Sequence, residues 1–294
     1  MNLDPEKIQP IRMYLSGIHE DFEDRGEKPK LSINTLPILN HKIWGLKEGL
    51  TVLGARTSQG KSALALQIAF DLADQSIPVV FLSLEMTVEA LIERLFCNVE
   101  CVDNHDILTG KFKKDSQIQT KWRTFAEYVS KIPLLITCGI GKDFYEINKL
   151  VQIVEPKPRV IIVDYVQAVA TKAGQSREMI NEYIRYFRQL ALENKFAGIL
   201  CSQINRGAAE SKSNEPHLYQ LKETGVLEEH ADTVLLLHWQ NFYTKDPSNA
   251  NEFKINIAKQ RNGRTGDHIL IYKPEYYKFT ERESRFEKQY EEVI

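Results

Sequence analysis

The sequence predicts an α/β fold in which helices flank a mostly parallel central sheet and an antiparallel hairpin closes the carboxyl-terminal side. The first observation is a series of continuous apolar runs that alternate with helical patterns: "GLTVLG" (49–54), "PVVFLSLE" (78–85), "IPLLIT" (132–137), "RVIIVDY" (159–165), "AGILCSQ" (197–203) and "DTVLLLH" (232–238). Such runs are typical of parallel strands that are buried on both faces. The second observation is that "FKINIAK" (253–259) and "HILIYK" (268–273) alternate with a period of two around the turn pair Asn262-Gly263, which predicts the hairpin.

The composition is that of an ordinary globular protein. The chain has 294 residues, of which 43% are hydrophobic and 27% charged, so it can bury the core of a large domain. No stretch approaches the roughly 18 to 20 consecutive apolar residues of a membrane span, and the amino terminus lacks the layout of a secretory signal. We therefore expect a soluble, cytoplasmic protein without a membrane partner. The net charge of −2 means that a polyanion would have to bind at a local basic patch.

The amino-terminal segment, residues 1–30, is predicted to be a helix followed by a charged linker, and residues 31–294 to be the main domain. Pro10 can begin the helix, and "EDRGEKPKL" follows it. The apolar positions form one helical stripe: Ile11, Leu15, Ile18 and Phe22. The helix could pack on its own domain, but a stripe on a polar linker can also reach a neighbouring subunit, which is the interpretation we favour.

Residues 55–62 read A-R-T-S-Q-G-K-S and fit a phosphate-binding loop. In such a loop, backbone N–H groups converge on phosphate oxygens, the lysine neutralises charge, and the hydroxyl holds Mg²⁺. Gly60, Lys61 and Ser62 supply these parts, and an alanine in the first position is a mild departure from the usual glycine. The residues expected to bind a nucleoside triphosphate are Ala55, Arg56, Thr57, Ser58, Gln59, Gly60, Lys61 and Ser62.

Three polar residues come at the ends of later apolar runs, where ligands of parallel sheets bind. Glu85 ends "VVFLSLE" and suits a base that orients the attacking water. Asp164 ends "VIIVD" and suits a carboxylate that holds Mg²⁺ together with Ser62. Gln203 ends "GILCSQ" and could sense the γ-phosphate. Each could separately be a helix cap or a surface residue, but together they predict a hydrolytic site.

These stretches resemble one family, the RecA-like motor domain of DnaB-type replicative helicases. The shared motifs run in family order from about residue 45 to 267: "ARTSQGKS", "FLSLEM", "LTGK", "VIIVDYVQ", "SQINR", "LKETGVLEEHAD" and "AKQRNGRTGD". The resemblance implies a RecA-like P-loop NTPase core that uses ATP and Mg²⁺ in a homo-oligomeric ring, usually of six subunits. It also implies a cytoplasmic location, in the host cytoplasm if a phage encodes the chain. It does not identify a loader or a primase.

The "KQRNG" motif carries the part of the site that the resemblance assigns to a neighbour. Lys259 and Arg261 match the pair that reaches the γ-phosphate of the adjacent subunit. A hairpin tip that carries these two residues and Arg264 has no evident partner in its own phosphate site, which agrees with this role. The alternative is a solvated charged turn.

The resemblance also implies that single-stranded DNA binds through two loops, around residues 170–177 and 205–225. The candidate DNA-binding residues are Lys172, Arg177, Arg206, Lys222, Glu223 and Gly225. Lys222 stands where arginine is typical, so a bidentate phosphate contact is lost while the charge is kept. The loops contain few aromatic residues, so binding should follow the DNA backbone and depend strongly on salt.

The departure from the family is at the amino terminus, where only some forty residues precede the motor instead of a domain of a hundred or more. This leaves a second hypothesis open, a RecA-like ATPase that acts as a loader, recombination factor or regulatory module without unwinding. A metabolic P-loop kinase fits poorly, because such an enzyme has no use for the "KQRNG" hairpin.

Overall fold

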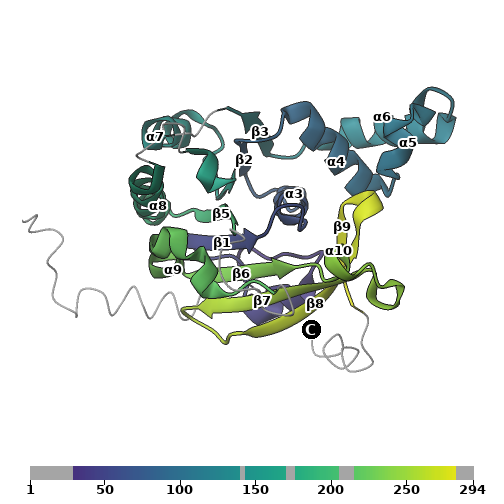
Figure 1. The fold of residues 1–294 in the computed structure, drawn as a ribbon. Helices are drawn as coiled ribbons and strands as arrows, with labels where there is room; N and C mark the ends of the chain where they lie inside the picture. Colours follow the sequence, from purple (N-terminus) through teal and green to yellow (C-terminus); the bar gives the residue numbers. More distant parts are fainter. Residues whose placement is uncertain (1–28, 140–142, 170–175, 205–214, 283–294) are drawn as a thin grey trace, which may run out of the picture.

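The computed structural model describes residues 29–139, 143–169, 176–204 and 215–282. Within these ranges, nine strands form one sheet in the order β3-β2-β4-β5-β1-β6-β7-β8-β9 (Figure 1). The strands are β1 (Gly49–Ala55), β2 (Val79–Ser83), β3 (Leu134–Cys138), β4 (Val160–Asp164), β5 (Ala197–Gln203), β6 (Thr233–His238), β7 (Glu252–Gln260), β8 (Gly266–Lys273) and β9 (Lys278–Glu281). The first six are parallel and the last three are antiparallel to their neighbours, which confirms the predicted fold class.

Helices cover both faces of this sheet. They are α2 (Pro37–Ile43), α3 (Lys61–Asp74), α4 (Val88–Glu100), α5 (Asn104–Leu108), α6 (Ser116–Val129), α7 (Phe144–Ile153), α8 (Ser176–Glu193), α9 (Gly225–His230) and α10 (Asn241–Thr244). Short 3₁₀ turns are η2 (Lys111–Lys113), η3 (Val166–Val169), η4 (Leu218–Thr224), η5 (Pro247–Asn249) and η6 (Pro274–Tyr276). None of the helices in the described part of the chain is long and apolar enough to cross a membrane.

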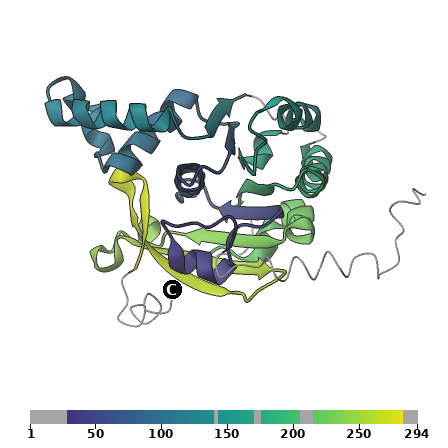
Figure 2. The ribbon, with the colours of Figure 1, turned by 180° about the vertical axis from the view of Figure 1, so that it is seen from behind.

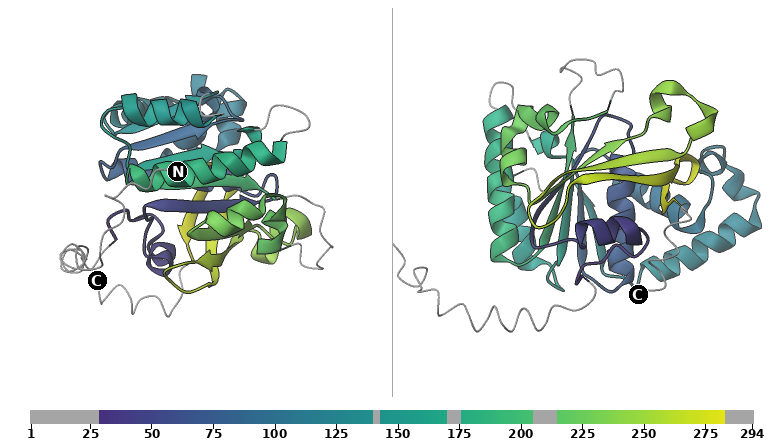
Figure 3. Two further views of the ribbon diagram at one scale, coloured as in Figure 1. Left: turned by 90° about the vertical axis from the view of Figure 1, so that its left-hand side faces the viewer. Right: turned by 90° about the horizontal axis from the view of Figure 1, so that it is seen from below.

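Two hydrophobic cores, one on each face, hold the layers together. Residues of α2, α3, α4 and α6 form one core with the sheet, and residues of α7, α8 and α9 form the other. Figure 2 shows α2 in front of the antiparallel strands, and the left panel of Figure 3 shows α8 lying across the parallel part of the sheet. Leu53 of β1 belongs to the first core and Val52 to the second, as the alternation of side chains along a strand requires. The central strands β1, β2 and β4 are therefore buried along their whole length.

The helices α4 to α6 form an arm that projects beyond the sheet, visible at the upper right of Figure 1 and the upper left of Figure 2. Aromatic packing joins α4 to α6 within this arm. The ring centroid of Phe96 lies 5.2 Å from that of Trp122 and 5.4 Å from that of Phe125. Asp115 caps α6 by accepting hydrogen bonds from two backbone N–H groups. The pattern of apolar runs did not indicate the arm.

The edge strand β9 is fixed to the buried helix α3 by Gln67. Gln67 Nε2 donates to the carbonyl of Phe279 at 2.8 Å, and the N–H of Phe279 donates to Gln67 Oε1 at 2.8 Å. Asn98 Nδ2 also donates to Gln67 Oε1 at 3.1 Å. One glutamine in an otherwise apolar helix therefore satisfies both backbone groups of a strand residue, which extends the predicted hairpin to three strands. The predicted amino-terminal helix, and with it most of the 1–30 segment, lies outside the described residues.

Candidate functional site

The phosphate loop connects β1 to α3 at the carboxyl edge of the parallel strands (Figure 1). Ala55 is the fully buried last residue of β1, and its carbonyl accepts a hydrogen bond from the N–H of Ile204 at 2.9 Å. Lys61 and Ser62 are the first two residues of α3. The loop therefore ends at the amino terminus of a 14-residue helix, where unpaired N–H groups and the helix dipole favour an anion. This confirms the strand, loop and helix order expected from the sequence.

The close packing of the loop explains Gly60. This residue has φ 68°, in the left-handed region that disfavours side chains, and a Cβ there would lie 3.0 Å from Phe279. Ser58, which is exposed, also has a left-handed φ of 62°. The loop conformation therefore depends on residues that follow it by about two hundred positions, in the antiparallel strands.

Gln59 anchors the loop to the end of β6. Its side chain is 1% exposed, and its Oε1 accepts a hydrogen bond from the N–H of Trp239 at 2.6 Å. The indole Nε1 of Trp239 donates to the carbonyl of Ala250 at 2.9 Å, which fixes the indole in turn. Of the other loop residues, Arg56 places its guanidinium carbon 6.0 Å from the ring centroid of Tyr243. The middle of the loop thus packs against the segment that follows β6.

Lys61 and Asp164 lie close together across the site. Lys61 Nζ is 3.8 Å from Asp164 Oδ1 and 4.5 Å from the ring centroid of Tyr165. Asp164 ends β4 and is 1% exposed, yet its Oδ1 has no hydrogen-bond partner among the described residues. A buried carboxylate oxygen without a donor is costly unless a ligand satisfies it. The oxygen donors of Asp164 and Ser62 fit a hydrated Mg²⁺, which prefers carboxylate, hydroxyl and water oxygens.

Gln203 contacts the phosphate loop directly. It is the last residue of β5, and its Nε2 donates to Thr57 Oγ1 at 2.7 Å. The side chain of Gln167 holds its backbone: Gln167 Nε2 donates to the carbonyl of Gln203 at 3.0 Å, and Gln203 N–H donates to Gln167 Oε1 at 3.0 Å. A residue in this place can respond to the loop and pass the response to the chain that follows β5.

Glu85 follows β2 by two residues and its side chain is exposed. The N–H of Leu84 donates to the carbonyl of Asp164 at 2.8 Å, so Glu85 begins next to the proposed magnesium carboxylate. Ser83 holds the turn after β2, because its hydroxyl donates to the carbonyl of Met86 at 2.7 Å. The strands β2, β4, β5 and β1 are neighbours in the sheet, so the predicted residues of the carboxyl edge do come together.

Lys259 and Arg261 lie at the opposite, amino edge of the parallel strands. Because β7 is antiparallel to β6, Gln260 pairs with Thr233, and Thr233 pairs with Thr51 near the start of β1. From there to the end of β1 the strand rises about 13 Å at about 3.3 Å per residue. The two cations are therefore too far from the phosphate loop of their own chain to reach a nucleotide bound there.

The two cations bind the carboxyl-terminal end of α9. Lys259 Nζ donates to the carbonyls of Glu228 at 2.5 Å and Glu229 at 3.2 Å. An Arg261 NH2 group donates to the carbonyl of Glu229 at 2.9 Å, and its NH1 lies 3.3 Å from Asp232 Oδ1. The expectation that both cations project from a hairpin tip is wrong for Lys259, which belongs to β7 itself.

The pKa of Lys259 reflects this crowding. Burial, and after it the positive charge of Arg261, lower the pKa of Lys259 below its ordinary value. Because the pKa in the folded state lies below that in the unfolded state, the charged lysine costs stability at neutral pH. That cost disappears as the pH rises through the lowered pKa. An anion close to Lys259 would relieve the same cost.

The predicted DNA-binding residues are only partly described. Lys172 and Arg206 lie outside the described residues. The backbone of Arg177 lies in the first turn of α8, and that of Lys222 and Glu223 in η4. Gly225 begins α9 with an ordinary helical φ of −51°, and a Cβ there would meet no atom of the described residues within 4 Å. The local fold therefore does not require glycine at this position.

Two residues that support the site were not predicted from the sequence. Tyr165 lies against Lys61, and burial, followed by the charges of Glu85 and Asp164, raises the pKa of Tyr165. Gln167 fixes the backbone of Gln203. The signal for both was present in "VIIVDYVQ", since a polar residue directly after a buried strand has to find a partner.

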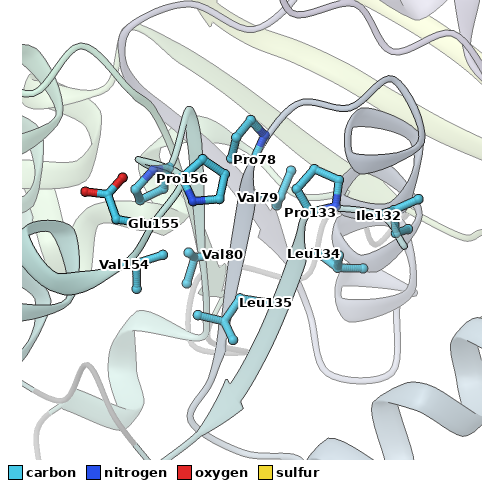
Figure 4. Close-up of a pocket in the computed structure, with 11 residues that line it drawn as sticks. Pro78, Val79, Val80, Ile132, Pro133, Leu134, Leu135, Val154, Glu155 and Pro156 are labelled. Atoms are coloured by element: carbon cyan, nitrogen blue, oxygen red, sulfur yellow. The ribbon is translucent and has the colours of Figure 1, made fainter. Parts of the chain in front are cut away.

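An apolar hollow of about 180 Å³ lies elsewhere, at the amino ends of β2 and β3 (Figure 4). Apart from Glu155, the described residues that line it have apolar side chains, and they include Pro78, Pro133, Pro156 and Pro158. The described residues that line it offer neither a helix amino terminus nor a cation, so this lining does not fit a phosphate.

Known proteins are similar to this chain in sequence. The model of the DnaB-like helicase C terminal domain family matches residues 34–281. The chain is 30% identical over 252 residues to the replicative DNA helicase DnaB of Geobacillus stearothermophilus, covering 82% of this chain and 54% of that protein. It is 30% identical over 250 residues to the replicative DNA helicase DnaC of Bacillus subtilis (strain 168), covering 82% and 54%. The chain thus spans about half the length of the curated relatives it matches.

Solved structures agree with these relatives. A solved ATPase domain superposes with a TM-score of 0.85 at 26% identity, covering 94% of this chain and 100% of that one. A DnaB-like replicative helicase, described with its interactions with primase, superposes with a TM-score of 0.83 at 25% identity, covering 94% of this chain and 68% of that one. The phosphate loop, the strand-end residues and the family match together show that this chain belongs to the DnaB-like helicase C-terminal domain family.

Proposed function

We propose that this chain is an ATP-dependent motor that forms a ring, with six subunits as the expected number, translocates on single-stranded DNA and unwinds duplex DNA. The family match and the relatives named replicative DNA helicases support the proposal. The observation that carries it is that the predicted phosphate-binding loop and the pair Lys259 and Arg261 lie at opposite edges of one sheet. Such a chain can build a complete site only with a second copy.

On this proposal, the carboxyl edge holds the nucleotide. Lys61 and Ser62 bind the phosphates, and Ser62 and Asp164 hold Mg²⁺ directly or through water. Magnesium, when bound, neutralises charge on the phosphate oxygens. Glu85 takes the proton of the attacking water, and Gln203 passes the loss of the γ-phosphate from the loop to the DNA-binding segment after β5. The contact of Gln203 with Thr57 supports this last role.

The amino edge completes the site of the neighbouring subunit. Lys259 and Arg261 present two cations on one edge, and the Arg261 side chain is 42% exposed, so it is accessible to another chain. Arginine and lysine at this position would stabilise the charge that develops on the γ-phosphate. Single-stranded DNA is proposed to bind through Lys172, Arg177, Arg206, Lys222, Glu223 and Gly225.

The test measures ATP turnover with and without single-stranded DNA, and displacement of a strand from a forked duplex. We expect turnover that DNA stimulates and that drives displacement. Glu85→Gln should keep nucleotide binding and lower turnover about 10²- to 10⁴-fold, as loss of a general base does. Turnover indifferent to DNA would contradict the proposal. Turnover that DNA stimulates, without displacement, would instead support the loader or regulatory alternative.

We also propose that residues 1–30 dock on a neighbouring subunit. Deletion of residues 1–28 should shift the assembly toward smaller species in sedimentation or mass photometry. The melting temperature of the motor domain, measured at a concentration where both proteins are monomeric, should stay unchanged. A deletion variant that assembles as well as the full chain would contradict this assignment.

A further inference from the structure

Asp232 connects three elements at the amino edge. It lies between α9 and β6, and its Oδ2 accepts a hydrogen bond from the N–H of Leu50 in β1 at 2.9 Å. Its Oδ1 accepts a hydrogen bond from Arg188 NH2 at 3.1 Å and lies 3.3 Å from Arg261 NH1. Gly49 makes this approach possible, because a Cβ at that position would collide with the Asp232 carboxylate. The contact with β1 thus holds Asp232 in place independently of the two arginines.

The guanidinium of Arg261 is held on several sides. In addition to Asp232 Oδ1, it contacts the carbonyl of Glu229, and the backbone N–H of Arg261 donates to the carbonyl of Asp232 at 2.9 Å. The side chain of Arg188 is 22% exposed and that of Asp232 is 24% exposed, whereas that of Arg261 is 42% exposed. The supports are therefore half-buried, and the group that they hold is the most exposed of the three.

We propose that Asp232, supported by Arg188, is a positioning residue that holds Arg261 in the orientation in which it enters the active site of the neighbouring subunit. This inference rests on the proposed shared site and names a residue that acts only through Arg261. A free arginine side chain loses substantial rotational freedom when it is fixed in one geometry. If Asp232 already restricts the Arg261 side chain before assembly, the entropic cost of ordering Arg261 at the transition state is smaller.

The first variant is Asp232→Asn, which keeps the volume and can still accept the hydrogen bond from Leu50. The amide is neutral and has only one acceptor oxygen, so it cannot bind both guanidinium groups, and the Arg261 side chain should become mobile. We expect kcat for ATP to fall by about ten- to thirtyfold with little change in KM, the size expected from the rotamer entropy of one arginine. Glu252→Gln, which breaks an ion pair with Arg282 at the other end of β7, is the matched control and should keep normal turnover. In an Arg261→Ala background, Asp232→Asn should cause no further loss.

Mixed assemblies separate positioning from a structural effect. Glu85→Gln subunits cannot turn over ATP but have a normal Arg261, while Asp232→Asn subunits have a normal phosphate loop. In an equal mixture about a quarter of the head-to-tail interfaces would pair a normal loop with a normal Arg261. Turnover should therefore rise well above that of either variant alone. A mixture of Glu85→Gln with Arg261→Ala should recover in the same way.

The two mixtures give three distinct results. Recovery in both supports the proposal. Recovery with Arg261→Ala but not with Asp232→Asn would show that Asp232 acts on its own site, which overturns the positioning role and leaves the shared site intact. Recovery in neither would overturn the shared site and the positioning role together. If Asp232→Asn does not assemble, Arg188→Ala replaces it, with an expected kcat loss of about threefold that should disappear in an Arg261→Ala background. An equal loss in that background would overturn the positioning role.

Discussion

Two buried or half-buried aspartates at opposite edges of the sheet have opposite surroundings. Asp164, at the carboxyl edge, has an oxygen without a hydrogen-bond partner among the described residues, and its nearest cation, Lys61, is 3.8 Å away. Asp232, at the amino edge, has a backbone N–H and two arginines around its carboxylate. Asp164 therefore keeps unused bonding capacity for a ligand, whereas both carboxylate oxygens of Asp232 are engaged by donors of its own chain.

This contrast predicts how substitutions at each edge should affect the stability of the protein and its binding of a ligand. A group with unsatisfied bonding capacity costs stability in the ligand-free protein and gains it when the ligand binds. A group inside a complete network contributes stability even when no ligand is present. Substitution of Asp164 should therefore reduce ligand binding with little effect on the stability of the ligand-free protein, whereas substitution of Asp232 should lower that stability.

The strongest effect should distinguish Arg261, at the amino edge, from Lys61, at the carboxyl edge. Arg261→Ala should lower kcat by about 10³- to 10⁵-fold, the range for loss of an arginine finger, and leave nucleotide affinity nearly unchanged. Lys61→Ala should lose nucleotide binding as well, because it removes the cation within the loop itself. Steady-state turnover and fluorescent-nucleotide titration measure the two properties. Unchanged turnover in Arg261→Ala would refute the division of the site between subunits.

The two aspartates should give opposite results in thermal and chemical unfolding. Asp232→Asn should lower the free energy of unfolding by about 1–2 kcal/mol, since it breaks half-buried charged hydrogen bonds. Asp164→Asn should change that of the ligand-free protein by no more than about 1 kcal/mol. It should remove stabilisation by magnesium nucleotide, which for the unmodified chain is about 2.7 kcal/mol at a ligand concentration a hundredfold above Kd. The same response in both variants would remove the contrast between the edges.

Acidification should weaken the carboxyl edge through His238. Burial, in spite of a hydrogen bond with Gln240, lowers the pKa of His238, and this residue directly precedes the Trp239 that holds the loop. A pKa lower in the folded than in the unfolded state gives stability that is present above the unfolded value of about 6.5 and is lost as the pH falls through the folded value. The slope from one proton is at most about 1.4 kcal/mol per pH unit.

Urea unfolding at several pH values between 7.5 and 5 measures this effect. Replacing His238 with glutamine should make the pH dependence of stability shallower than in the unmodified chain. His105→Gln, on the exposed helix α5, is the control and should leave the slope as it is. An equal slope in the His238 variant would mean that acid acts elsewhere.

The weakest effect concerns Gly225. Gly225→Ala should raise the free energy of unfolding by about 0.5 kcal/mol, because the backbone is already helical and a Cβ meets no described atom. If Gly225 approaches DNA, the added methyl group should weaken single-stranded DNA binding by about 1 kcal/mol, roughly fivefold in Kd. A variant that is more stable and binds DNA equally well would remove Gly225 from the proposed DNA-binding set.

Most of the fold and the carboxyl edge could be predicted because their signals are local. Asp164 and Gln203 each end a continuous apolar run, and parallel strands place such ends together without any knowledge of distant contacts. The amino edge depends instead on contacts between distant positions. Arg188 and Arg261 meet at Asp232 from α8 and from the turn after β7, and no periodicity in the sequence reports that meeting. The strand β9 was missed for the same reason, although Gln67 in an apolar helix was a sign of it.

The antiparallel direction of β7 determines that a second chain is needed to join the two sets of residues. It directs Lys259 and Arg261 away from the loop of their own chain, and in a head-to-tail assembly the same contact repeats from one subunit to the next. On the shared-site proposal, an open chain of n subunits contains only n − 1 complete centres, and closure completes the last one. Turnover per subunit should therefore rise with oligomer size below closure. An open filament would then leave one incomplete centre, whereas a closed ring would leave none.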